Sequence, residues 1–426
     1  MIFQKLKSSY FIKNTATLIG GTTIAQALPL LFAPVISRLF LPEDFSLYGI
    51  FISIYAIAGS AITLKYERAI MLPVDDNEAK EIVTISLINS FVFSIFLFII
   101  LFLFKSPIAS MFPDERIEQY LLLVPIAAFF LAANNTLINW FNRIQKYKTI
   151  ASNKIVRNTL LTGFNLGTGF ALIGAIGLII SQIISDGIAV SYYFYIYLKN
   201  ALQFKFTFRF KTLKQLASRY KEFPLFALPA TFIDTISMQL PLLMIATLFS
   251  QSLSGNYFFA YRILILPVSL IGAAFAQTFY QTFVAHIQQR HYSIALSFLK
   301  KSWLLLFAII IMPAIVLMFW GTPIFTYVFG AEWTESGRIA SILIFYMMFS
   351  FISSPTSTTY IALDMQKYNL IFSTVVCLYR FSTIYTGYLL NDFYLGLKLL
   401  VVCEFIQIAV YNSVIYLRLN KMQKQL

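Results

Sequence analysis

The sequence predicts an all-α membrane protein that crosses the bilayer twelve times. Three observations lead to this fold class. Of the 426 residues, 59% are hydrophobic and only 12% are charged, and the mean hydropathy is +0.75. A soluble domain carries about 25% charged residues, because water must solvate its surface. Apolar runs of about 20 residues, each long enough to cross a hydrocarbon core of about 30 Å, recur along the whole chain.

The twelve predicted spans form two groups of six. The first group covers residues 16–39, 47–65, 82–104, 120–140, 153–173 and 176–198. The second group covers residues 224–249, 257–281, 302–320, 338–361, 369–390 and 395–417. We therefore expect an N-terminal six-helix lobe over 1–198, a basic amphipathic cytoplasmic linker over 199–223, and a C-terminal six-helix lobe over 224–426.

The linker contains the sequence FKFTFRFKTLKQL at residues 204–216, in which apolar and cationic residues alternate before a short amphipathic stretch begins. This pattern favours a segment that lies on anionic lipid headgroups. A docking site for a cytoplasmic partner is the alternative.

The net charge of +14 indicates membrane orientation and argues against nucleic-acid binding. Of the 32 Lys and Arg residues, 24 fall in the termini and in alternate connections. These are Lys5, Lys7, Lys13, Lys65, Arg68, Lys80, Arg143, Lys146, Lys148, Lys154, Lys199, Lys205, Arg209, Lys211, Lys214, Arg219, Lys221, Arg290, Lys300, Lys301, Lys367, Arg418, Lys421 and Lys424. Because Lys and Arg accumulate on the cytoplasmic side, we expect both termini in the cytoplasm.

Two prolines interrupt the first span of each half. Pro29 and Pro34 lie in one, and Pro229 and Pro241 in the other. The tetrapeptide Leu-Pro-Leu-Leu also occurs in both spans, at residues 28–31 and 240–243. Proline-interrupted spans at matching positions of two repeats point to a transport pathway, with the prolines as hinges. The alternative is that they only kink lipid-facing helices, which membranes tolerate.

Six ionisable residues fall inside predicted spans, where each costs at least about 2.5–3.5 kcal/mol on insertion scales. They are Arg157, Asp186, Asp234, Arg262, Arg380 and Glu404. The functional interpretation is a wet interior in which the arginines attract an anion, since a guanidinium donates two hydrogen bonds to phosphate at once. The carboxylates could then bind a proton or cation.

Two structural alternatives stay open for these charges. Arg380 with Glu404, and Arg262 with Asp234, are at similar depths in neighbouring spans and could form interhelical ion pairs. Arg157 is close to the cytoplasmic end of its span, so it could snorkel. Arg262 lies about five residues, or about 8 Å, from the outer end of its span and could do the same.

Other chemistry is sparse in this sequence. His286 and His291 have no Cys or carboxylate cluster around them, so we expect no metal site, and we find no phosphate-binding glycine loop. We expect no cofactor. Gly163 and Gly167 form a G-x-x-x-G motif, which predicts close helix packing.

Three blocks of sequence resemble bacterial polysaccharide flippases. They are TLKYERAIMLP (63–73), FPLFALPATFIDTISMQLPLLMIATLF (223–249) and YFFAYRILILPVSLIGAAFAQTFY (257–280). The chain is similar over nearly its whole length to the Wzx-type O-antigen and capsule flippases of the multidrug/oligosaccharidyl-lipid/polysaccharide exporter superfamily. Arg262 lies inside one of these blocks, whereas Arg380, Asp186 and Glu404 do not.

The resemblance implies two lobes in a V around a central cavity that opens to one side at a time. It implies a multi-pass protein of the bacterial inner membrane that turns an undecaprenyl-diphosphate-linked oligosaccharide to the periplasmic face, driven by an ion gradient. The partners it allows are membrane lipids, a polysaccharide polymerase and a chain-length regulator. The resemblance makes Asp234 and Glu404 candidates for the coupling ion.

The main alternative is a cation-coupled multidrug exporter of the same superfamily. Such an exporter would need a cavity rich in carboxylates and aromatic residues, whereas arginines here are about as numerous as acids. An O-antigen polymerase or ligase would need a large periplasmic loop, but the longest outer connections, 105–119 and 321–337, have about 15 residues each. We therefore do not expect an enzyme.

If Arg262 lines the outer half of a cavity, Arg262→Ala should impair transport and leave the amount of protein in the membrane near normal. Immunoblots of membranes beside a transport assay test this expectation. An equal loss of membrane protein and transport would indicate a structural ion pair instead.

Overall fold

The computed structural model describes residues 2–201, 210–353, 356, 359, 363 and 367–424, and within this part the regular elements are all helices. A helix satisfies every backbone polar group within one segment, which the hydrocarbon core demands. The chain divides into two compact units, Met1–Gln239 (unit 1) and Leu240–Leu426 (unit 2). The division falls inside a single helix, α9 (Leu228–Leu248).

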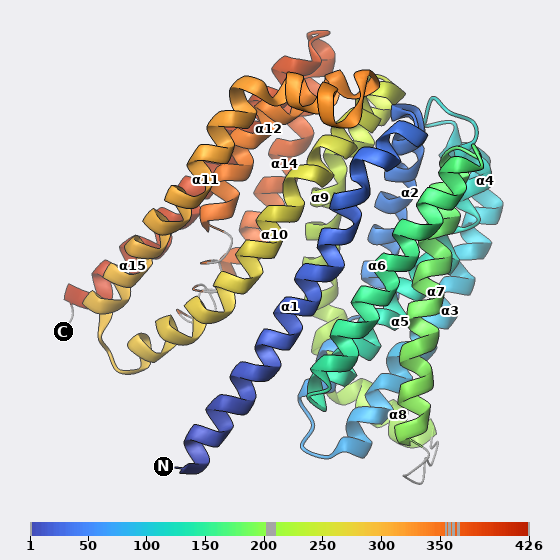
Figure 1. Ribbon diagram of the computed structural model, residues 1–426. Helices are drawn as coiled ribbons and strands as arrows, with labels where there is room; N and C mark the ends of the chain where they lie inside the picture. The colour runs from blue at the N-terminus through green and yellow to red at the C-terminus, as the bar shows by residue number, and fades with distance from the viewer. Residues whose placement is uncertain are drawn as a thin grey trace. The chain divides into compact units, whose positions relative to one another are not determined.

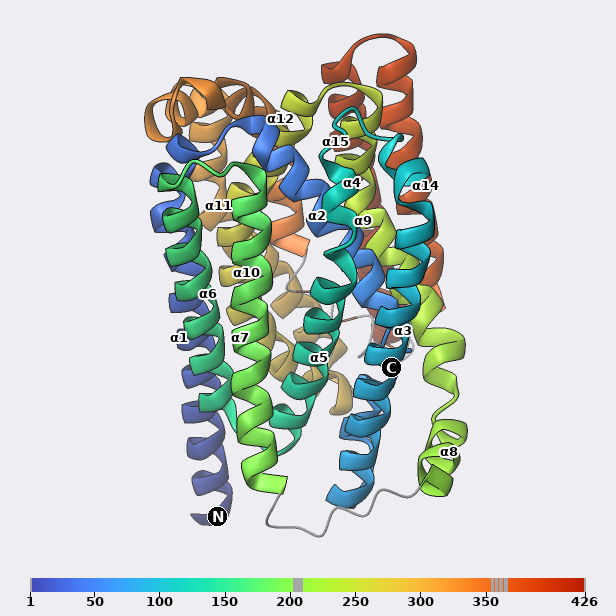
Figure 2. The ribbon, with the colours of Figure 1, turned by 90° about the vertical axis from the view of Figure 1, so that its right-hand side faces the viewer.

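Unit 1 contains the helices that precede Leu240 (Figure 1). They are α1 (Ile2–Leu39), α2 (Pro42–Ala61), η1 (Tyr66–Met71), α3 (Asp76–Ala109), α4 (Ile117–Leu121), α5 (Val124–Arg143), α6 (Tyr147–Phe170), α7 (Ala175–Ala201), α8 (Phe210–Arg219), η2 (Phe223–Ala227) and the first part of α9. Helices α1, α6 and α7 lie side by side (Figure 2).

Unit 2 contains the remainder of the chain. Its helices are the end of α9, α10 (Gln251–Gln288), α11 (Tyr292–Phe329), η3 (Ala331–Trp333), α12 (Thr334–Ser353), α14 (Lys367–Leu389) and α15 (Phe393–Lys424). The last two form an antiparallel hairpin (Figure 1).

Ten helical segments of the described chain are long and apolar enough to cross a membrane. Helices α6 and α14, which are 24 and 23 residues long, are not among these ten. Every predicted span overlaps one of these twelve segments. The predicted span 338–361 extends past the end of α12 at Ser353, and most of that extension lies outside the described residues.

The four predicted hinge prolines are all found in or at the start of helices. Pro29 and Pro34 lie inside α1, and Pro241 lies inside α9. Pro229 is the second residue of α9, which begins directly after the π-helical turn η2. The carbonyl of Pro34 accepts hydrogen bonds from the hydroxyl of Ser37 and the guanidinium of Arg38.

Glycines allow the α14–α15 hairpin to close. A Cβ at Gly387 would lie 2.7 Å from the Cα of Gly396 and 2.9 Å from the carbonyl oxygen of Asp392. By contrast, a Cβ at Gly163 or Gly167 would meet no atom within 4 Å. The prediction of close packing at the G-x-x-x-G motif is therefore wrong, because those glycines point to open space.

This contrast gives a matched pair of substitutions. Gly387→Ala would force the backbones of α14 and α15 apart, and overpacking of this kind costs about 1–3 kcal/mol. Gly163→Ala should be neutral or slightly stabilising, since alanine is the better helix former. Melting temperatures of the two purified variants measure the difference. Equal melting temperatures would contradict the packing at Gly387.

Candidate functional site

The helical path of unit 1 is interrupted between α2 and α3. Helix α2 ends at Ala61, and the two residues Leu64 and Lys65 have positive φ angles of 52° and 62°. Left-handed backbone is unfavourable for residues with a side chain, and it persists only where the surroundings impose it. Such interruptions cluster at functional sites. This one falls within the block TLKYERAIMLP at residues 63–73.

The interruption buries an ion pair. The Nζ atom of Lys65 lies 3.6 Å from Oε1 of Glu67, and the two side chains are 9% and 7% exposed. Burial lowers the pKa of Lys65, while the Glu67 carboxylate opposes this shift. The second oxygen of Glu67, Oε2, is buried and has no hydrogen-bond partner among the described residues. A buried carboxylate oxygen without a donor is costly and is a natural place for a proton, water or cation.

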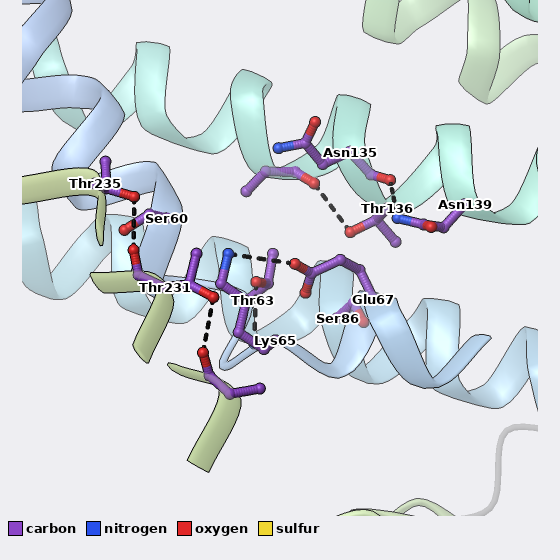
Figure 3. Close-up of polar contacts among 12 residues, drawn as sticks. Ser60, Thr63, Lys65, Glu67, Ser86, Asn135, Thr136, Asn139, Thr231 and Thr235 are labelled. Atoms are coloured by element: carbon purple, nitrogen blue, oxygen red, sulfur yellow. Dashed lines mark hydrogen bonds and ion pairs between the residues drawn. The ribbon is translucent and has the colours of Figure 1, made fainter. Parts of the chain in front are cut away.

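Hydroxyl and amide side chains surround this pair. Figure 3 shows them on α2, α3, α5 and α9 and, for Thr63, in the turn between α2 and η1: Ser60, Thr63, Ser86, Asn135, Thr136, Asn139, Thr231 and Thr235. Several donate their own hydrogen to a carbonyl of their own helix, as Thr136 does to Ala132 and Thr231 does to Ala227. Such hydroxyls retain only acceptor lone pairs for a ligand. The surroundings of Glu67 therefore favour a positively charged or hydrogen-donating ligand.

Arg143, at the end of α5, holds the segment that follows η1. Its Nη1 atom donates to the carbonyl oxygens of Ile70 at 3.0 Å and Pro73 at 2.7 Å, and its Nε donates to Oδ1 of Asp76 at 2.9 Å. The Nη2 atom donates to the carbonyl of Val74 at 3.3 Å. The planar guanidinium suits this role because its five donors have a fixed geometry.

The linker helix α8 packs against the same region of unit 1. Leu213, Leu216 and Tyr220 are buried in a core that also contains Tyr66 and Ile82. The hydroxyl of Tyr66 donates to the carbonyl of Ala217 at 3.0 Å, which links η1 to α8. The apolar face of α8 is thus covered by protein. The outward residues Lys214 and Arg219 of α8, and Lys221 just after it, are exposed and leave a cationic surface.

Helices α6 and α7 share an ion pair whose carboxylate, that of Asp186, is buried. The guanidinium of Arg157 donates from Nε to Oδ1 of Asp186, whose other oxygen accepts from Gln182 at 2.7 Å. The hydroxyl of Tyr48 on α2 donates to Gln182 at 2.8 Å. On the other side, Arg157 donates to the side chain of Asn158 at 3.1 Å. Arg157 is therefore held by a network within unit 1.

A second buried pair joins α14 to α15 in unit 2. The Nε atom of Arg380 lies 2.7 Å from Oε1 of Glu404, and the side chains are 12% and 6% exposed. Tyr257 and Tyr261 of α10, Tyr346 of α12 and Tyr379 of α14 lie within electrostatic range of the pair. This is the pairing that the sequence offered as the structural alternative for these two residues.

Arg262 and Asp234 lie in different units, on α10 and α9. The guanidinium carbon of Arg262 is 5.8 Å from the centre of the Phe258 ring, within the range of a cation–π contact. Asp234 is one turn of α9 from Thr231, which belongs to the surroundings of Glu67.

Sequence reasoning missed two of these features. It treated Lys65 as a topology charge and did not single out Glu67, although both lie inside the quoted block. It also did not pair Arg157 with Asp186. The sequence did hold a signal for the Lys65–Glu67 pair, because a carboxylate follows the lysine by two residues at the end of an apolar run. A lysine that only snorkels to the membrane surface does not need such a partner.

No metal site is visible in the part of the chain that the structure describes, since no three His, Cys, Asp or Glu residues group together there.

The sequence model of one protein family, described as polysaccharide biosynthesis protein, matches residues 35–338. No curated protein matches the chain.

Several solved structures have the same fold. A multidrug resistance MATE family transporter of the MOP superfamily, inward-facing, has a TM-score of 0.72 at 14% identity, covering 95% of this chain and 96% of that one. The lipid II flippase MurJ, inward closed, has a TM-score of 0.73 at 15% identity, covering 97% and 90%. A MOP superfamily transporter from Pyrococcus furiosus, described as having a binding pocket of reverse polarity, has a TM-score of 0.58 at 14% identity, covering 96% of each chain. The chain is therefore an all-α membrane protein with a MATE-like fold.

The contacts of Arg143 give a prediction about the interruption. Arg143→Lys keeps the charge but loses the fork, so it should destabilise the protein by at least about 2 kcal/mol, because hydrogen bonds to charged groups are worth about 1.5–3 kcal/mol each. Arg219→Lys is the control, since the Arg219 side chain is 65% exposed and exposed ion pairs contribute about 0–1 kcal/mol. Thermal unfolding in detergent would compare the two variants. If Arg143→Lys were as stable as wild type, the role of Arg143 in holding the segment after η1 would be contradicted.

Proposed function

Because this chain belongs to the polysaccharide biosynthesis protein family, we propose that it is a flippase for a polyprenyl-diphosphate-linked oligosaccharide. It moves the repeat unit of an O-antigen or capsule from the cytoplasmic to the periplasmic face of the inner membrane. The proposal includes twelve membrane-spanning helices in two lobes around a central cavity, with both termini in the cytoplasm. The MATE-like fold supports alternating access as the mode of transport.

The buried Lys65–Glu67 pair carries the proposal. Lys65 supplies an ammonium that a diphosphate can engage, and its ion-pair contact with Glu67 is long, at 3.6 Å. A phosphate oxygen at hydrogen-bond distance would compete well with that contact, because charge-assisted hydrogen bonds of about 2.7–2.9 Å are the strong ones. Engagement of Lys65 by phosphate would leave Glu67 without its counter-ion.

Glu67 then becomes the candidate for the coupling ion. Its Oε2 atom is buried without a partner, and acceptor-rich hydroxyls surround it. A carboxylate that loses a neighbouring cation binds H⁺ or Na⁺ more tightly. Substrate binding at Lys65 and ion binding at Glu67 would thus support each other. Asp234, one turn from Thr231, remains a second candidate for the ion, and Arg262 a second cation for the substrate.

Arg157 and Arg380 are weaker candidates for substrate than the sequence suggested. Each already donates to a buried carboxylate. Exchange of that partner for a phosphate would leave a buried, unpaired Asp186 or Glu404. Breaking a buried pair in this way costs about 3–5 kcal/mol, so the substrate would gain little by binding there.

A cation-coupled multidrug exporter is the second candidate. The observation that favours it is the acceptor-rich environment of Glu67, which suits an organic cation as well as a small ion. In that case Lys65 would hinder the substrate rather than bind it. Replacement of Lys65 therefore separates the two functions.

The test is complementation of a strain that lacks its own flippase but makes the matching repeat unit. Wild type should restore surface polysaccharide. Lys65→Met should reduce it by at least about tenfold, since one charge-assisted hydrogen bond is worth about 1.5–3 kcal/mol, and should trap lipid-linked repeat units on the cytoplasmic face. Lys214→Met, on the exposed face of α8, is the matched control and should behave as wild type.

All variants are compared at equal membrane levels. If wild type fails to rescue, and Lys65→Met improves the efflux of a cationic dye, the flippase proposal is wrong and the exporter takes its place.

A further inference from the structure

The two buried arginine–carboxylate pairs occupy matching places in the chain. Arg157 and Asp186 lie on α6 and α7, and Arg380 and Glu404 lie on α14 and α15. In the predicted order of spans, these are the fifth and sixth helices of the first half and of the second half. The partners are 29 and 24 residues apart, and the arginine comes first in both.

The chemistry of the two pairs also matches. In each, the Nε atom of the arginine donates to one carboxylate oxygen across a helical hairpin. Both acids are buried, with Asp186 at 6% and Glu404 at 5% exposure. The agreement in order, donor atom and burial supports the internal repeat that Leu-Pro-Leu-Leu suggested, and it rests on different residues.

A carboxylate at such a depth must be neutralised, because the unpaired charge is too costly in a low-dielectric interior. Three species can do this: a proton, a bound metal cation, or a fixed cationic side chain. An arginine differs from the first two because it never loses its charge in proteins and cannot leave. An acid held by arginine therefore cannot exchange an ion during a transport cycle.

We propose that Arg157 and Arg380 are built-in counter-cations that take the place of an exchangeable cation at Asp186 and Glu404. The inference deepens the proposed function, since it removes these two acids from the coupling mechanism. It also implies a latent cation site at each position. Loss of the arginine would leave a buried carboxylate that binds Na⁺ or H⁺ to recover neutrality.

The surroundings of Glu404 suit such a latent site. The titratable groups around it are Arg380 and Tyr379 on α14, Tyr346 on α12, Tyr257 and Tyr261 on α10, and Cys403 on α15 itself. Tyrosine hydroxyls offer oxygen ligands to a small cation. Around the Arg157–Asp186 pair lie the titratable groups Tyr48 and Tyr55 on α2, together with the Gln182 amide on α7.

The experiment measures the melting temperature of the full-length protein in NaCl and in choline chloride of equal ionic strength, at neutral and mildly acidic pH. The variants are Arg380→Met, Arg380→Met/Glu404→Gln and Glu404→Gln, beside wild type. Arg380→Met should be stabilised by Na⁺ or by acid, with a shift of at least about 2 °C beyond that of wild type. The double variant should lose this extra shift and melt close to wild type.

Wild type and Glu404→Gln should respond to Na⁺ equally, because any exchangeable ion would bind elsewhere. A wild-type response that disappears in Glu404→Gln would overturn the inference. So would a folded Arg380→Met without extra cation dependence, or a double variant that no longer folds. If Arg380→Met alone fails to fold, recovery by the double variant still supports a counter-ion role.

Complementation adds a second measurement, whose result would change if Arg157 or Arg380 bound the substrate. The double variants Arg380→Met/Glu404→Gln and Arg157→Met/Asp186→Asn should keep most of the wild-type polysaccharide. Loss of polysaccharide by a folded double variant would mean that the arginine itself is needed, and would contradict the inference. Failure of wild type to complement would count against the proposed function only, because the melting experiment does not depend on it.

Discussion

Three buried carboxylates of this protein, Glu67, Asp186 and Glu404, are each paired with a cationic side chain of the same chain, and much else in each unit follows from that constraint. A charge in the hydrocarbon region is tolerated only with a partner. Asp186 and Glu404 obtain theirs from the neighbouring helix of a hairpin, which fixes how α6 packs on α7 and α14 on α15. The Gly387–Gly396 contact brings the second hairpin close enough for its pair to form.

The Lys65–Glu67 pair differs from the other two in ways that suit function. It lies where α2 has ended, on left-handed backbone, and its partners are only two residues apart. One oxygen of Glu67 is left without a donor among the described residues, whereas the second oxygen of Asp186 accepts from Gln182. Arg143 and α8 hold the surrounding segment in place. A site that must bind and release a charged ligand needs this combination of a rigid frame and an incompletely satisfied pair.

The sequence predicted the membrane class and most helices, because hydropathy depends on composition alone. It also offered the Arg380–Glu404 pair, since both residues lie deep in neighbouring spans. It could not identify Asp186 as the partner of Arg157. Arg157 lies near one membrane surface, so snorkelling explained its position in the span equally well. Lys65 was not singled out as a buried, paired residue, because the predicted span ran to residue 65, although α2 stops at Ala61. The amphipathic pattern of α8 could not distinguish a protein surface from a lipid surface, and the glycines of α6 could not show which way they point.

Reconstitution would test the central claim most directly. Purified protein in proteoliposomes would be given a fluorescent polyprenyl-diphosphate oligosaccharide, under an imposed H⁺ or Na⁺ gradient, and its movement between leaflets would be followed. The account predicts gradient-stimulated movement by wild type that is lost in Lys65→Met and retained in Arg380→Met/Glu404→Gln. Movement that persists in Lys65→Met but stops in the neutral double variant would contradict it.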